Sequence, residues 1–206
     1  MANHDVQLET MHLYRALAGQ HEDWGGRLVL LIGAQHVHNG AASGVSIAGG
    51  ATLAIASDAA AMKAAMRAGH LDFVVNSLDE ALRALKNEVR QKRPLGVGLI
   101  ADVEATLAEM EERGIQPDLR LTPEGCAHVS SKGDENFFAA NDMAGLRGID
   151  VALAAVLPAE DVVRRRWIER APQFLREARS GGRWIWLREA ELAALAGLGT
   201  IPSPRR

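Results

Sequence analysis

Cysteine is almost absent from this chain, because Cys126 is the only one among 206 residues. A lone cysteine cannot form an intramolecular disulfide, so the composition suits a reducing compartment. The first residues lack the charged and apolar segments of a secretion signal, and no apolar run approaches the ~20 residues that a membrane-spanning helix needs. We therefore expect a soluble, cytoplasmic protein with no membrane partner.

Long runs of positive charge are missing as well. Lys and Arg number 23 against 26 Asp and Glu, which leaves a formal net charge of -3. Residues 164–166 are three consecutive arginines, but Glu160, Asp161 and Glu169 flank them, which is typical of a solvated helix face. The electrostatic pattern of a nucleic-acid-binding protein is therefore absent, and we expect no nucleic-acid partner.

What the sequence does contain is a regular alternation of short apolar runs and amphipathic segments. The runs that predict strands are residues 27–32, 52–56, 71–75, 95–100 and 118–121, and the segments that predict helices are residues 6–20, 40–48, 59–68, 77–92 and 102–113. Short connections between alternating strands and helices require parallel strands with right-handed crossovers. The predicted fold is therefore α/β: a doubly wound, Rossmann-like parallel sheet in three α/β/α layers.

The pattern weakens after residue 122, where a smaller C-terminal α/β extension is expected. Residues 123–136 predict a long loop, 149–157 a sixth, buried strand, and 159–180 a helix interrupted at Pro172. Residues 183–187 predict an aromatic strand on which Trp184 and Trp186 share one face, for domain packing or a subunit interface, and residues 189–198 a last helix. The expected division is an N-terminal helix and loop (1–25), the Rossmann-like domain (26–157) and C-terminal elements packed on it (158–206).

Residues 26–44 organise the rest of the chain. They combine a strand that Gly33 ends, a tight turn, and small residues that open a helix from Gly40. A strand, a turn and a helix start form the phosphate-facing edge of nucleotide-binding α/β units. Here the turn carries His36 and His38 where such folds usually keep glycine.

Further segments at residues 26–30, 45–50, 69–72, 77–82, 98–100 and 113–118 follow one another in a specific order and spacing. Together they resemble the central NAD-binding domain of urocanase (urocanate hydratase), over a little under half of the chain. The resemblance implies a Rossmann-like fold with NAD at the carboxyl ends of the strands. The residues expected to contact such a cofactor lie in the first turn and after the fourth strand: Gly33, Gln35, Asn39, Gly40 and Asp102.

The departures from urocanase fall on the positions that grip NAD in that family. The glycine-rich turn is replaced by residues 36–38, a glutamate for a ribose hydroxyl by Ala56, and an arginine one helical turn later by Ala61. Urocanase is also more than twice this length, and its flanking catalytic region has no counterpart here. We therefore expect a stand-alone domain that binds a nucleotide or a small anionic metabolite, without urocanate hydratase activity by itself.

The same departures suggest a different chemistry. If the family geometry persists, the segments after the first and fifth strands reach one crevice, which brings together His36, His38, Cys126 and His128. These four side chains could ligate zinc, or serve as three ligands with an open catalytic position, while Asp102 orients an imidazole. Two alternatives stay open: Cys126 as a nucleophile activated by histidine, or loop residues at a degenerate site with Cys126 as a small buried hydrophobe.

Three functions remain in competition at this point. The first is the ligand-binding Rossmann domain, and the second is a metal- or cysteine-dependent enzyme that uses the four His and Cys residues. An enzyme of this kind would have a lyase- or hydratase-like, or a metal-dependent, activity. The third is a non-catalytic subunit that forms a homo-oligomer or binds a partner chain.

Overall fold

The computed structural model describes residues 3–34, 40–122, 135–179 and 181–203. In the first part of the chain the elements are α1 (Asn3–Gln20), β1 (Leu28–Ile32), α3 (Ala41–Ala48), β2 (Ala51–Ala56), α4 (Ala59–Ala68), β3 (Phe73–Val75), α5 (Leu78–Arg90), β4 (Leu95–Ile100), α6 (Val103–Glu112) and β5 (Leu119–Leu121). The C-terminal elements are β6 (Glu135–Ala139), α8 (Met143–Val156), α9 (Val162–Phe174), a 3-10 turn (Glu177–Arg179), β7 (Gly182–Trp186) and α10 (Glu189–Gly197).

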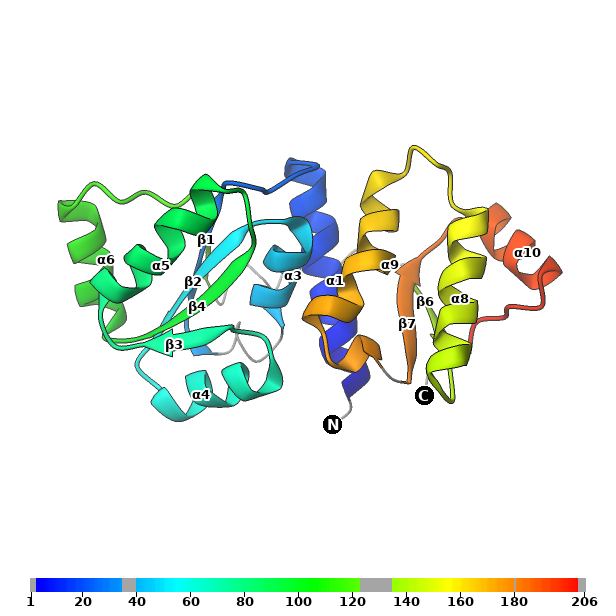
Figure 1. Cartoon of the computed structure of the whole chain (residues 1–206), viewed down its shortest axis with the longest axis horizontal. Coiled ribbons are helices and arrows are strands. Elements are labelled where there is room, and N and C mark those ends of the chain that lie inside the picture. The colour runs from blue at the N-terminus through cyan, green and yellow to red at the C-terminus, as the bar shows by residue number, and fades with distance from the viewer. Residues whose placement is uncertain (1–2, 35–39, 123–134, 180, 204–206) are drawn as a thin grey trace.

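The first five strands form one parallel sheet in the order β3-β4-β2-β1-β5. Helices α3 and α4 contribute to the core on one face, and α5 and α6 contribute to the core on the other (Figure 1). The central strand β2 is buried along its whole length, as expected for a parallel strand covered on both faces. The predicted doubly wound, three-layer α/β fold is confirmed.

Local signals account for where these helices begin and end. Asp58, Ser77 and Asp102 accept backbone N–H groups in the first turns of α4, α5 and α6. Gly69 ends α4 in the left-handed conformation that glycine adopts without strain. The boundaries predicted for residues 59–68 and 95–100 therefore coincide with α4 and β4.

Helix α1 stands between the sheet and the C-terminal elements (Figure 1). Its residues Met11, Tyr14 and Leu17 are fully buried, and they belong to a core that runs continuously from α3 to α9 and β7. One hydrophobic core thus joins one face of the sheet to the C-terminal elements. Within the described residues every helix is too short or too polar to serve as a membrane span.

The prediction of a sixth buried strand at residues 149–157 was wrong, because residues 149–156 form the second half of α8 and Leu157 is its C-cap. The helix begins after Asp142, whose carboxylate accepts the Gly145 N–H at 2.8 Å. Its buried side chains, Leu146, Ile149 and Leu153, recur at helical spacing. A continuous apolar run fits a buried strand or a buried helix equally well, and the alanines in this run favour the helix.

The aromatic strand was predicted correctly, but its partner was missed. β7 pairs antiparallel with β6, whose first residues had been assigned to a loop. Trp184 packs on Phe137 with ring centroids 5.2 Å apart, and Trp186 lies 6.3 Å from Tyr14. Both indoles therefore pack within the chain.

A buried ion-pair network ties α9 to α10 and β7. Arg164 donates to both carboxylate oxygens of Glu191 at 2.5 and 2.7 Å, to Asp161 at 2.7 Å and to the Trp186 carbonyl at 3.3 Å. The hydrogen bonds from Arg164 hold the pKa of Glu191 below its ordinary value of 4.5. Residues 164–166 were predicted to form a solvated helix face, and for Arg164 that prediction was wrong.

Replacing Glu191 by Gln should lower the free energy of unfolding by about 3 kcal/mol, because Arg164 then keeps a buried charge without its main partner. The folded-state pKa of Glu191 is depressed, so its carboxylate stabilises the fold above the unfolded pKa, and this stabilisation is lost as pH falls through the folded pKa. In urea unfolding across pH 3 to 7, the free energy of unfolding should therefore fall less on acidification in E191Q than in the natural chain. Glu189→Gln, at an exposed site in the same helix, is the control, and equal effects from both would contradict this account.

Candidate ligand site at the carboxyl edge of the sheet

The carboxyl ends of β1, β2 and β4 lie side by side. Ile32 pairs with Ile55, and Ala56 pairs with Ile100. The pairing continues past the strands, because the Ala101 N–H donates to the Ala56 carbonyl at 3.2 Å. The helix after β2 covers one face and the helix after β4 covers the other, so the topological switch point lies between these two strands. Open α/β sheets bind their ligands at such a point.

The amino end of α3 lies at this edge after β1, because a helix that connects two parallel strands runs antiparallel to them. Its N-cap residue, Gly40, is left-handed with φ 73°, and its carbonyl accepts the Gly44 N–H at 3.0 Å and the Thr10 hydroxyl at 3.2 Å. A Cβ atom on Gly40 would overlap with Thr10 Oγ1, so only glycine fits here. Glycine also offers no side-chain oxygen to the first-turn amides, which therefore need another acceptor.

The helices that start on either side of the switch point begin differently. Asp58 Oδ1 accepts the N–H groups of Ala60 and Ala61 at 2.9 Å each, and Asp102 Oδ1 accepts the Ala105 N–H at 2.8 Å. Both carboxylates are exposed, and in the described part of the chain neither Oδ2 atom has a hydrogen-bond partner. Because α4 and α6 carry acidic caps, the amino end of α3 is the more favourable place for an anion at this edge.

The predicted site residues divide into two groups. Gly33, Gly40 and Asp102 lie at the carboxyl edge, where the Gly33 N–H donates to the Ile55 carbonyl at 2.9 Å. The others, which lie outside the described residues, are Gln35, His36, His38, Asn39, Cys126 and His128. Their roles as ligands, catalysts or cofactor contacts stay predictions.

The strand order nevertheless bears on the His and Cys prediction. β1 and β5 are hydrogen-bonded neighbours, with Leu31 opposite Leu121. In the sequence, residues 35–39 begin three positions after β1 and residues 123–134 begin two positions after β5. Within residues 3–34, 40–122, 135–179 and 181–203, no group of three or more His, Cys, Asp or Glu side chains is placed to hold a metal ion.

The position expected for a ribose contact is apolar. Ala56, the last residue of β2, is buried and has no side-chain polar atom. Asp58 is the first carboxylate after β2 and caps α4, and the sequence analysis did not include it among the site residues. Its signal in the sequence is an acidic residue directly after the second strand, where dinucleotide-binding folds hold a ribose hydroxyl.

A second polar contact was also missed. Ser43 Oγ lies 3.1 Å from His70 Nδ1, and both side chains are buried. This buried contact joins α3 to His70, which follows the C-cap of α4. Its location indicates a structural role rather than a contact with a ligand at the carboxyl edge.

The comparison with known families agrees with this geometry. A family model described as Urocanase, the urocanase Rossmann-like domain, matches residues 8–138. The match is wider than the resemblance found from the sequence, and it includes most of α1, all five strands of the parallel sheet and most of β6. It covers more than half of the 206 residues, so the chain belongs to the urocanase family, through the Rossmann-like domain of that family.

Proposed function

We propose that the carboxyl edge of the sheet binds a nucleotide of the NAD type or a small anionic metabolite. The observation that carries this proposal is the amino end of α3, which starts at Gly40 without a side-chain cap at the carboxyl edge of a urocanase-family sheet. Backbone N–H groups at such a helix end bind phosphate or carboxylate oxygens.

The described residues fit part of a dinucleotide. The first turn of α3 would hold a phosphate, and the free Oδ2 of Asp58 would accept a ribose hydroxyl. Ala56 contributes no side-chain acceptor, so the ribose would have fewer hydrogen-bond partners than the family resemblance implies. NAD, when bound, would supply an electrophilic nicotinamide ring. Hydration of urocanate is not part of the proposal, because Ala56 and Ala61 replace polar residues of the family's cofactor grip.

A metal- or cysteine-dependent site is the second candidate, and the neighbouring positions of β1 and β5 favour it. The segments after these strands carry His36, His38, Cys126 and His128. Imidazole nitrogens and a thiolate are the ligands that zinc prefers. We propose that these side chains meet above the ends of the two strands.

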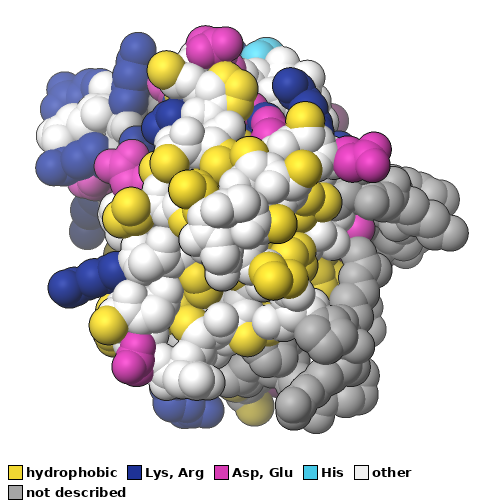
Figure 2. All heavy atoms as spheres, turned by 90° about the vertical axis from the view of Figure 1, so that its right-hand side faces the viewer, with side chains coloured by type: hydrophobic (Ala, Val, Ile, Leu, Met, Phe, Trp, Pro, Cys, Tyr) yellow, Lys and Arg dark blue, Asp and Glu magenta, His cyan; other side chains and the backbone are white. Residues whose placement is uncertain are grey.

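Association with a second copy of the chain is the third candidate, and it is favoured by an apolar surface on α8 and α10. Met143, Val151, Leu198 and Ile201 are 54%, 70%, 59% and 70% exposed. Apolar side chains gather across this end of the molecule, with few charges among them (Figure 2). Such surfaces mark interaction sites, and a nearly uncharged one can face its own copy without repulsion. We propose an isologous dimer through this end.

Ligand binding is tested by thermal unfolding with NAD, ADP-ribose and pyrophosphate. At about 100 times its Kd, a ligand adds about 2.7 kcal/mol to the free energy of unfolding, which raises Tm by roughly 5 to 10 °C. Asp58→Ser keeps a capping oxygen but removes Oδ2, so it should weaken nucleotides about tenfold and leave pyrophosphate unaffected. Asp142→Ser, at the distant cap of α8, is the control. No shift with any of the three ligands would refute the proposal, and urocanate consumption with added NAD separates binding from catalysis.

The metal site is tested by elemental analysis of protein purified without a histidine tag. We expect about one zinc ion per chain, lost in the double variant His36→Ala, Cys126→Ser. His21→Ala, at an exposed position beside Trp24, should keep the metal. A metal-free protein with an unchanged fold would exclude the metal-dependent form of this candidate.

Self-association is tested by light scattering during size exclusion over a range of concentrations. The natural chain should show twice its mass of 22.1 kDa at high concentration. Val151→Glu should abolish the dimer, because it places a charge at a 70% exposed apolar position of α8. Val162→Glu makes the same change on α9 and should leave the dimer intact. A mass that stays monomeric at every concentration would contradict the proposal.

A further inference from the structure

A groove of about 870 Å³ lies between α5 and the segment that follows α6, residues 113–118. Five apolar side chains line it: Leu28, Leu82, Leu85, Val89 and Ile115. Leu28 begins β1, and Asp118, another lining residue, directly precedes β5. This α5–α6 groove therefore runs along α5 from Asp79 in its first turn to Arg90 in its last, and it reaches the amino ends of β1 and β5.

The strand order explains why the groove exists. α5 connects β3 to the adjacent β4, whereas α6 must carry the chain from β4 past β2 and β1 to β5. The two helices therefore cannot pack tightly along their length. An ion pair of 2.7 Å between Asp79, in the first turn of α5, and Arg113, after α6, joins the two walls.

One wall of the groove carries uncompensated positive charge. Arg83, Lys86 and Arg90 follow one another at turn-by-turn spacing on α5, and all three are exposed. In the described part of the chain Arg83 and Lys86 have no ion-pair partner, and Arg90 contacts only the Asn87 side chain, at 3.3 Å.

The carboxylates in the same lining are already engaged. Asp79 is paired with Arg113, and Asp118 accepts the Leu28 N–H at 2.8 Å and lies 3.4 Å from Arg27. The lining thus holds four cationic side chains against two satisfied carboxylates, although the whole chain has a net charge of -3. A positive surface beside an apolar floor complements a ligand with an anionic head and an apolar body.

We propose that the α5–α6 groove binds a small amphipathic anion, with a hydrocarbon or aromatic body on the apolar floor and a carboxylate, sulfonate or phosphate head beside Lys86 and Arg83. The groove volume falls within the range of small-molecule sites, about 300 to 1,000 Å³. The ligand is taken from solution, and the site is independent of the function proposed for the carboxyl edge.

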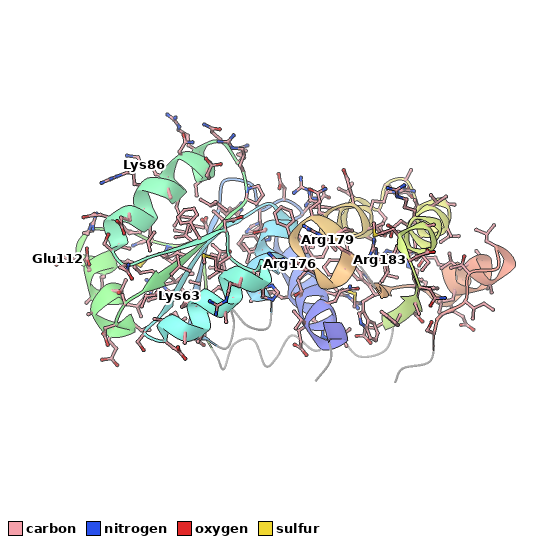
Figure 3. All side chains as sticks on the ribbon, turned by 60° about the horizontal axis from the view of Figure 1, so that its bottom comes forward. Lys63, Lys86, Glu112, Arg176, Arg179 and Arg183 are labelled. Carbon is pink, nitrogen blue, oxygen red and sulfur yellow. The ribbon has the colours of Figure 1, made fainter. Side chains whose placement is uncertain are left out.

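The probe for this site is anilinonaphthalene sulfonate, which has an aromatic body, one sulfonate and a fluorescence that rises in apolar surroundings. Reversing two charges of the wall, in Arg83→Glu, Lys86→Glu, should weaken its binding about tenfold or more, because charge-assisted contacts are lost. The matched control is Lys63→Glu, Arg67→Glu on α4, which covers the opposite face of the sheet (Figure 3). The control should stay within about twofold of the natural chain.

Competition then separates charge from apolar contact. Decanoate should displace the probe, whereas decanol, with the same hydrocarbon length and no charge, should need about ten times the concentration. The proposal would be overturned if decanoate and decanol displaced the probe equally well, or if both double variants lost the same affinity for the probe. It would also be overturned if neither the probe nor decanoate bound. Co-sedimentation with anionic phospholipid vesicles would also overturn it, because the groove would then serve a membrane surface. Far-UV circular dichroism and Tm confirm that each variant folds, and Lys86→Gln replaces the double variant if that one does not.

Discussion

The close contact between α1 and α3 is the constraint on which the rest of this structure depends. Gly40 and Gly44 face α1, and a Cβ atom on Gly40 would overlap with Thr10 Oγ1. The missing side chains let the two helices approach until all eight residues of α3 are buried. α1 then presents Met11, Tyr14 and Leu17 to a core shared with the C-terminal elements. The sheet and these elements are therefore stabilised together.

This packing leaves α3 without an exposed side chain. α1, the sheet and α9 pack against it, and its N-cap Gly40 and first turn are buried as well. The starts of α3, α4 and α6 differ in how they are stabilised and in how well they suit an anion. Asp58 and Asp102 stabilise α4 and α6 by about 1 kcal/mol each as N-caps, but they also place negative charge there. α3 is stabilised by burial instead and needs no acidic cap.

The two edges of the sheet carry opposite kinds of surface. At the carboxyl edge, exposed carboxylates cap α4 and α6, whereas α3 starts without a side-chain cap. At the amino edge, the α5–α6 groove combines an apolar floor with unpaired cations. Family membership bears on the sheet, because the matched residues 8–138 contain all five of its parallel strands. The α5–α6 groove depends on the long connection that α6 makes and on side chains of α5. Proteins that share a fold can differ in such surface side chains.

The amino-acid sequence by itself determined the alternating elements of the sheet and the family resemblance. Apolar runs bounded by Gly, Pro and Asp carry their own start and stop signals, which is why α4 and β4 were located to the residue. At residues 149–157 the local signal was ambiguous, and burial of Leu146, Ile149 and Leu153 against neighbouring elements decided for a helix. The order β3-β4-β2-β1-β5, the pairing of β6 with β7, the burial of Arg164 and the groove beside Lys86 were decided only by the tertiary structure. These features depend on contacts between residues far apart in the chain, which no short stretch of sequence encodes.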